Sequence, residues 1–167
     1  GTPGTCVACV MEGSRPILAE VQALAAKSGF AAARRNSNGI DYNRAMLLLA
    51  VLEKRGGLPV SGCDVYINVV GGLQLDEPAA DLATLLAVAS SYRDAPISSD
   101  LAAIGEVGLS GEVRSVTQLN HRLSETARLG FRRCIIPSHV RGDVQRPEGL
   151  ELISVRNVRE AIREALK

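Results

Sequence analysis

Aromatic residues are scarce in this sequence, which has no tryptophan, three tyrosines and two phenylalanines among 167 residues. Large rings therefore cannot build its core. Apolar residues still make up 46% of the chain, so aliphatic side chains must fill the interior, as they do where helices are layered on sheets. A chain of this length can bury a sufficient core without disulfides or metals, and we expect one domain over residues 1–167.

Lysine is also scarce. Only Lys27, Lys54 and Lys167 are lysines among the 19 basic residues, and the rest are arginines. A lysine can lose its proton and act as a base, whereas an arginine stays charged and binds phosphate or carboxylate through a planar fork of donors. The sequence therefore offers many anion-binding groups and few bases. Because the formal net charge is only +1, binding to nucleic acid would require local clusters of arginine.

Metal-ligand patterns are missing. Cys6 and Cys9 have CxxC spacing, but they lie in an apolar run without a second close pair, and Cys63 and Cys134 are isolated. A structural zinc site needs four ligands, so we expect buried, reduced cysteines in a cytoplasmic protein and no metal site. The two histidines are far apart in the sequence and are expected at the surface.

Long hydrophobic runs are absent as well. The longest covers residues 45–52, which is far too short to cross a bilayer, and no charged leader with an apolar core is present. We therefore expect no contact with a membrane. The abrupt start, Gly-Thr-Pro-Gly-Thr, leads us to expect a fragment of a longer protein.

Apolar alternation predicts several strands. Residues 5–12 and 16–25 predict a hairpin, although the second run could also form a helix. Residues 31–35 would continue the sheet and residues 36–39 would form a loop. The remaining predicted strands are 64–70, with both faces covered, a hairpin within 101–114, and the short strands 134–137 and 150–155.

Helical periodicity and capping residues predict four helices. The first covers 42–55 with Asp41 as its cap, and the second covers 79–91, opened by Pro78 and apolar on nearly every side. The third covers 117–129, with Arg122 on the flank between its apolar and polar faces, and the fourth begins at Asn157. Asp76 or Glu77 is the expected cap of the second helix, and Thr117 that of the third.

Residues 71–81 join the strand predicted over 64–70 to the helix predicted over 79–91. A strand, a glycine-marked turn and a helix opened by proline are a common mount for a nucleophile or an anion. The helix mouth, however, carries Ala79 and Ala80, which have no reactive atom. No lysine follows a glycine-rich turn with Ser or Thr behind it, so the sequence contains no Walker loop for a nucleotide.

Arg44 lies in the first turn of the helix predicted over 42–55. The positive end of the helix dipole disfavours a cation there by ~0.3 to 1 kcal/mol. Together with Arg34 and Arg35 just upstream, Arg44 could form an anion site at the N-terminus of this helix. Alternatively, Arg44 pairs with Asp41 or with another neighbour.

Several runs, taken in order, resemble the proteolytic domain of Lon proteases over almost the whole chain. They are residues 64–72, the pentapeptide Glu77-Pro78-Ala79-Ala80-Asp81, and residues 105–113 and 130–137. Closer still is the resemblance to the Lon-like C-terminal domain of the RadA (Sms) family of bacterial recombination and repair proteins. It rests on Met11-Glu12-Gly13-Ser14-Arg15-Pro16, Asp41-Tyr42-Asn43-Arg44, Val69-Val70-Gly71-Gly72-Leu73 and Glu77-Pro78-Ala79-Ala80-Asp81-Leu82. The implied fold is α+β, similar to the Lon proteolytic domain (ribosomal protein S5 domain 2-like), with mixed sheets and packed helices.

The resemblance implies that the catalytic positions are lost. Active Lon domains read Gly-Pro-Ser-Ala-Gly at the helix mouth, with the serine as nucleophile, a later lysine as its base and a hydroxyl residue that supports the lysine. Those positions match Ala79, Arg122 and Ile104. Alanine cannot form an acyl-enzyme, and arginine cannot act as the neutral base. We predict a pseudo-protease without enzymatic activity; the alternative is an active or rearranged serine-type peptidase that uses Ser110 or Thr117.

The resemblance also implies a hexameric ring platform that binds double-stranded DNA and works with a RecA-like ATPase in branch migration or D-loop extension during homologous recombination. Contact with RecA is left open, and further copies of the chain are expected partners. ATP, magnesium and zinc would belong to the ATPase and zinc finger that the chain lacks, so no cofactor is expected here. The candidate DNA ligands, each of which could instead be an ordinary surface or interface charge, are Arg15, Arg34, Arg44, Arg114 and Arg122.

Overall fold

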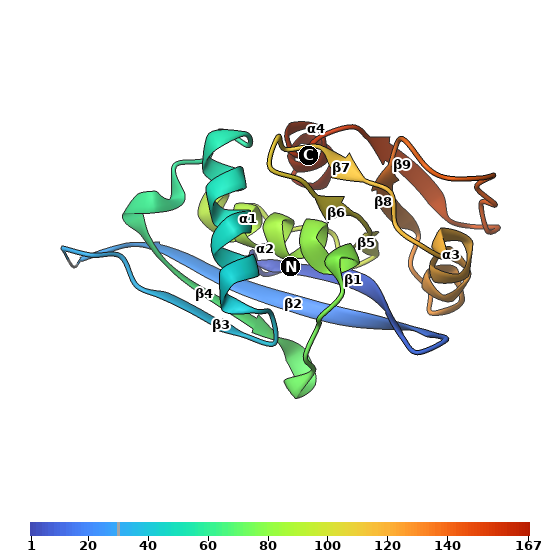
Figure 1. The fold of residues 1–167 in the computed structure, drawn as a ribbon, viewed down its shortest axis with the longest axis horizontal. Helices are drawn as coiled ribbons and strands as arrows, with labels where there is room; N and C mark the ends of the chain where they lie inside the picture. Colours follow the sequence, from blue (N-terminus) through green and yellow to red (C-terminus); the bar gives the residue numbers. More distant parts are fainter. Residues whose placement is uncertain (30) are drawn as a thin grey trace.

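A seven-stranded mixed sheet forms the centre of the computed structural model, which describes residues 1–29 and 31–167 (Figure 1). Neighbouring strands follow the order β3-β4-β2-β1-β5-β8-β9. β2 pairs antiparallel with β1 and β4, and the other neighbours are parallel. β6 (Glu106–Val107) and β7 (Val113–Arg114) form a separate hairpin. The sheet strands are β1 (Thr5–Glu12), β2 (Arg15–Lys27), β3 (Arg35–Asn38), β4 (Cys63–Val69), β5 (Leu101–Ala103), β8 (Arg133–Pro137) and β9 (Glu151–Val155).

Three helices, α1 (Tyr42–Lys54), α2 (Asp81–Arg93) and α4 (Val158–Ala165), cover one face of this sheet (Figure 1). α2 lies at the centre of this layer, because every residue from position 81 to position 91 is buried. Its apolar side chains join those of α1, α4 and the inward residues of the strands in one large core cluster. The prediction of a central helix after Pro78 is confirmed, and so is the α+β fold class with a mixed sheet.

α3 (Leu119–Arg128) packs on the opposite face of the sheet. Leu123 of this helix forms a second core cluster with Cys9 of β1, Ala102 of β5 and Cys134 of β8. Successive strand residues point to opposite faces, so the neighbours of these residues belong to the first cluster. The sheet is therefore buried on both faces only where α3 covers it.

Part of this second face remains open. Leu24 of β2 and Tyr66 of β4 are direct cross-strand partners, and they are 58% and 39% exposed. The prediction that both faces of the strand over 64–70 are covered is therefore wrong. Tyr66 and Asn68 alternate with apolar residues in the sequence of β4, and they are the residues at which this strand meets solvent.

Residues 16–25 lie within strand β2, which confirms the predicted strand over the helix alternative. The predicted loop over 36–39 is wrong, because β3 pairs in parallel with β4. Its polar composition suits an edge strand with solvent beside it. Arg35 fixes this strand by donating from its guanidinium to the carbonyl oxygens of Cys63 and Val60, at 2.6 and 3.2 Å.

Two of the four predicted helix caps are confirmed. The side chains of Asp41 and Asn157 each accept from a backbone N–H three residues on, at 3.0 Å. Thr117 does not cap α3, because Gln118 precedes that helix with φ 57° and no side-chain cap is present. The α2 entrance also has no side-chain cap from Asp76 or Glu77.

The four cysteines are buried and unbonded to one another. Cys6 and Cys9 are three residues apart on β1, so they point to opposite faces and belong to different core clusters. They cannot share a ligand. Burial raises the pKa of Cys6 to about 12 and that of Cys9 to about 11, and burial also raises the pKa of Cys134.

Alkylation should therefore spare these thiols in the folded protein. Iodoacetamide at pH 8 is expected to leave Cys6, Cys9 and Cys134 unmodified, because the sulfur atoms are buried and the thiolate form is rare. In urea the same residues should react fully, as mapped by peptide mass spectrometry. Rapid modification of Cys6 and Cys9 in the native protein would contradict their place in the core.

Candidate functional site

The joint between β4 and α2 contains two turns of 3-10 helix, η2 (Val70–Gly72) and η3 (Pro78–Ala80). Gly71 and Gly72 have φ angles of 84° and 71°, a left-handed conformation that favours glycine. Leu75 then forms a parallel bridge with Ile40, which ties the joint to the entrance of α1. The chain is thus led back onto the sheet before α2 begins.

Ala79, at the predicted nucleophile position, is 2% exposed. Its carbonyl oxygen accepts from the N–H of Gly105 at 3.2 Å, and the carbonyl of Gly105 accepts from Leu82 at 3.1 Å. A Cβ at position 105 would lie 2.7 Å from Val113, so this close approach requires glycine. The helix mouth is sealed against the loop that follows β5.

Arg122 lies directly beside this mouth, and it is 1% exposed. Its two Nη atoms donate to the two carboxylate oxygens of Glu77, with Nη2 at 2.9 Å from Oε2. Nη1 also donates to the carbonyl of Cys9 at 3.0 Å, and Nε donates to the carbonyl of Thr117 at 2.8 Å. The N–H of Met11 donates to Glu77 at 2.8 Å. The guanidinium is therefore enclosed by partners from three segments of the chain.

This enclosure decides the role of Arg122. A phosphate cannot reach a guanidinium that is buried and already paired with a carboxylate, so the DNA-binding role predicted for Arg122 is wrong. The carbonyl of Thr117 accepts from Arg122, and the residue that directly precedes α3 is Gln118. The third lost position, Ile104, is fully buried in the cluster under α3.

A second ion pair fixes the other side of the mouth. Asp81 is 3% exposed and accepts from Arg44, with Nε at 2.9 Å from Oδ1 and Nη2 on Oδ2. The N–H of Val107 donates to Asp81 at 3.0 Å, and its carbonyl accepts from Arg44 at 3.1 Å. The Asp81 carboxylate raises the pKa of Arg44. Arg44 thus forms an ion pair with Asp81, which agrees with the alternative that it pairs with another residue. Asp41 serves only as the cap of the helix.

The pocket beside this pair has a volume of about 330 Å³. Arg44 shares its lining with four carboxylates, those of Asp41, Asp76, Glu77 and Asp81. Such a pocket repels a phosphate. The anion site predicted for Arg34, Arg35 and Arg44 is therefore not formed, since Arg35 donates to the carbonyls of Cys63 and Val60 and Arg44 pairs with Asp81.

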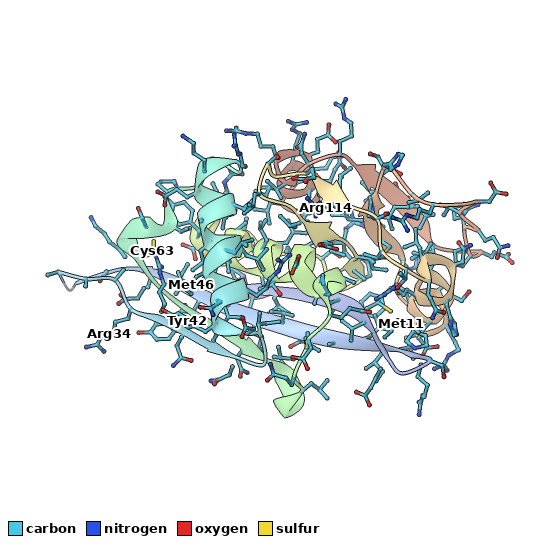
Figure 2. All side chains as sticks on the ribbon, viewed as in Figure 1. Met11, Arg34, Tyr42, Met46, Cys63 and Arg114 are labelled. Atoms are coloured by element: carbon cyan, nitrogen blue, oxygen red, sulfur yellow. The ribbon has the colours of Figure 1, made fainter. Side chains whose placement is uncertain are left out.

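The remaining DNA candidates are dispersed. Arg15 is exposed at the turn between β1 and β2, and Arg34 is exposed before β3, where its N–H donates to Asp64 at 2.7 Å. Arg114 on β7 pairs with Glu112 at 2.9 Å and lies 3.8 Å from Glu106. Figure 2 shows Arg34 at the lower left of the molecule and Arg114 well away from it, near the upper middle. The structure does not bring these arginines together, and their binding to DNA stays a prediction.

The sequence reasoning did not identify Glu77 and Asp81 as ion-pair partners. One signal was available for Asp81, because a carboxylate in a helix that is apolar on nearly every side is buried and needs a cation. Nothing local in the sequence pointed from Glu77 to Arg122, which is 45 residues away.

Within residues 1–29 and 31–167, no group of three or more His, Cys, Asp or Glu side chains could hold a metal ion. None of the helices that these residues form is long and apolar enough to cross a membrane.

Comparison with known proteins gives a consistent result. The model of the Lon protease (S16) C-terminal proteolytic domain matches residues 59–167. The chain is 49% identical to the DNA repair protein RadA of Bacillus subtilis, over 99% of this chain and 36% of that protein. The RadA proteins of Listeria monocytogenes and Streptococcus pneumoniae are 46% and 43% identical, over 99% and 98% of this chain and 36% and 39% of their own lengths. The chain thus spans little more than a third of these relatives.

Removing the partner of the buried arginine should destabilise the fold. We expect E77A to lower the free energy of unfolding by roughly 3 kcal/mol, because it leaves the Arg122 guanidinium buried without a counter-ion. Urea unfolding followed by circular dichroism measures this loss. The matched control is R128A, which breaks an exposed pair with Glu125 and should have a far smaller effect. Equal, small losses in both variants would contradict the structural role of Glu77.

Proposed function

The chain belongs to the family of Lon protease (S16) C-terminal proteolytic domains, and we propose that it is a non-proteolytic member of that family. We propose further that it serves as an oligomeric platform and a double-stranded-DNA-binding module in homologous recombination and DNA repair. The proposal rests on the ion pair between Arg122 and Glu77, which occupies the place of a catalytic base, and on similarity to DNA repair proteins.

The absence of peptidase activity follows from chemistry at the helix mouth. Ala79 offers no nucleophile, and the guanidinium of Arg122 is charged and fully paired. The three lysines lie at the ends of β2 and α1 and at the last residue, away from this mouth. Ser110, a substitute nucleophile considered above, lies on the exposed β6–β7 turn, where its N–H donates to Glu112. A rearranged peptidase would need a base that these residues do not supply.

The platform role is supported by the open part of the sheet. Leu24 and Tyr66 are exposed side by side, and together with the first residues of the chain they line a hollow of about 650 Å³. Such a surface suits contact with a further copy of the domain. A hexameric ring is the assembly that the family resemblance implies.

DNA binding is supported by the exposed arginines. Arg15 and Arg34 lie near opposite ends of β2, and arginine holds phosphates without reading bases. Arg44 and Arg122 drop out of the binding set because they hold Asp81 and Glu77, and Arg114 already has two glutamate neighbours. Binding by this domain must then use arginines on its outer surface.

Other parts of the proposal concern the protein to which the domain belongs. We place it in the cytoplasm, joined to a RecA-like ATPase and a zinc finger that would hold ATP, magnesium and zinc. Branch migration or D-loop extension, and contact with RecA, would be activities of that larger protein.

Restoring the two lost catalytic residues should not restore hydrolysis. In A79S/R122K, the new lysine would lie beside the Glu77 carboxylate, which would raise its pKa and keep it protonated. We expect no cleavage of casein and no labelling by a fluorophosphonate probe. The triple variant E77G/A79S/R122K, which also lacks the Glu77 carboxylate, is the matched comparison for A79S/R122K. Cleavage or labelling by the unchanged protein would overturn the non-proteolytic assignment.

Duplex DNA should bind with a strong dependence on salt. Fluorescence anisotropy over a salt series is expected to give a negative slope of log K against log salt, at about 0.9 per phosphate contacted. R15A/R34A should reduce the slope by up to about 2. R93A/R163A removes the same charge from two other exposed sites and is the control. A domain that shows no salt-sensitive binding, even when oligomeric, would be a structural platform only.

A further inference from the structure

Three parallel strands of the sheet begin side by side. Leu101 of β5 pairs with Arg133 of β8, and Arg133 pairs with Glu151 of β9. The residues at these strand starts therefore meet at one edge of the sheet, and Figure 1 shows the labels β5, β8 and β9 on adjacent strands. This edge is distinct from the helix mouth and carries none of the arginines predicted to bind DNA.

A recess of about 530 Å³ lies at this edge and is lined by three arginines, Arg132, Arg133 and Arg146. Arg132 and Arg133 come from the start of β8, and Arg146 comes from the segment before β9. The other charged residues of the lining are Asp100 and Glu151. Three arginines from two separate segments thus line the same recess.

The backbone holds these arginines in place. The N–H groups of Arg132 and Arg133 both donate to the carbonyl of Asp100, at 2.9 and 3.2 Å, and the carbonyl of Arg132 accepts from Glu151 at 2.8 Å. Arg146 donates from Nη1 to the carbonyl of Leu150 at 3.2 Å. Because a guanidinium carries five N–H donors, this bond fixes Arg146 and leaves most of its donors for a ligand.

The charges around the recess favour an anion. Arg133 lies 3.7 Å from Asp100, which is too long for a close hydrogen-bonded pair, and Asp100 also accepts from the hydroxyl of Ser98 at 2.7 Å. Three cations face two carboxylates here. The pocket at the helix mouth has the reverse balance, with four carboxylates around the single cation Arg44. An incoming phosphate is attracted to the first recess and repelled by the second.

We propose that this recess is a phosphate-binding site, and that its ligand is a phosphate of the DNA backbone. The assignment deepens the proposed function on which it rests, because it gives the duplex a docking point that the sequence did not identify. Arginine forks match phosphate oxygens and carry no base preference, so the site would position a duplex without reading its sequence.

The test compares duplex binding by two double variants. R132A/R146A should weaken binding on the order of tenfold and reduce the salt slope by about 2, because two phosphate contacts are lost. R93A/R163A, with the same net charge, should bind as the unchanged protein does. R132K/R146K should keep the salt slope while losing part of the affinity, because lysine retains the charge but not the fork. Thermal unfolding of each variant checks that the fold is intact.

The outcomes separate this site from the wider proposal. Duplex binding that R132A/R146A leaves unchanged would overturn the recess while DNA binding by the domain stands. If the unchanged protein does not bind duplex at all, the proposed DNA function fails and DNA is excluded as the ligand. Inorganic phosphate then serves as the probe. Stabilisation by phosphate that is lost in R132A/R146A would support a site for free phosphate, and no stabilisation would overturn the site altogether.

Discussion

The buried guanidinium of Arg122 is the group on which the helix mouth depends. A cation with 1% exposure is stable only when its donors meet acceptors, and here Glu77 and the carbonyls of Cys9 and Thr117 supply them. These partners belong to β1, to the entrance of α2 and to the approach to α3. One side chain therefore fixes how three elements meet, on the face of the sheet that α3 covers.

The ion pair between Asp81 and Arg44 fixes the helix mouth on the other side of Ala79. By the resemblance to active Lon domains, Glu77 and Asp81 both stand where those domains have glycine. The buried Asp81 carboxylate would be destabilising without Arg44, and the buried Arg122 guanidinium would be destabilising without Glu77. These residues form two coupled sets, so a change at one position is expected to affect its partner. The mouth is a structural joint held by charge.

Much of the fold could be read from the sequence because its signals are local. The apolar character of α2, the alternation in β2 and the caps at Asp41 and Asn157 each depend on a few neighbouring residues. The polar edge strand β3 was missed because its pairing with β4, and not its composition, determines its structure. Arg122 was predicted to lie on the flank of a helix and to bind DNA, because nothing near it in the sequence reveals its partner Glu77, 45 residues away. Long-range charge pairing was the main part of the site that local patterns could not show.

Ion pairing also determines which arginines are available to bind nucleic acid. The number of arginines in the sequence overstates the number available to phosphates, because Arg44 and Arg122 serve as internal counter-ions and Arg114 faces two glutamates. Positive charge is in excess at the strand starts that carry Arg132 and Arg133, because arginines outnumber carboxylates there. The ion pairs of Arg44 and Arg122 thus make the helix mouth unfavourable for an anion. Phosphate binding is consequently favoured at the edge of the sheet, where the guanidinium groups remain accessible.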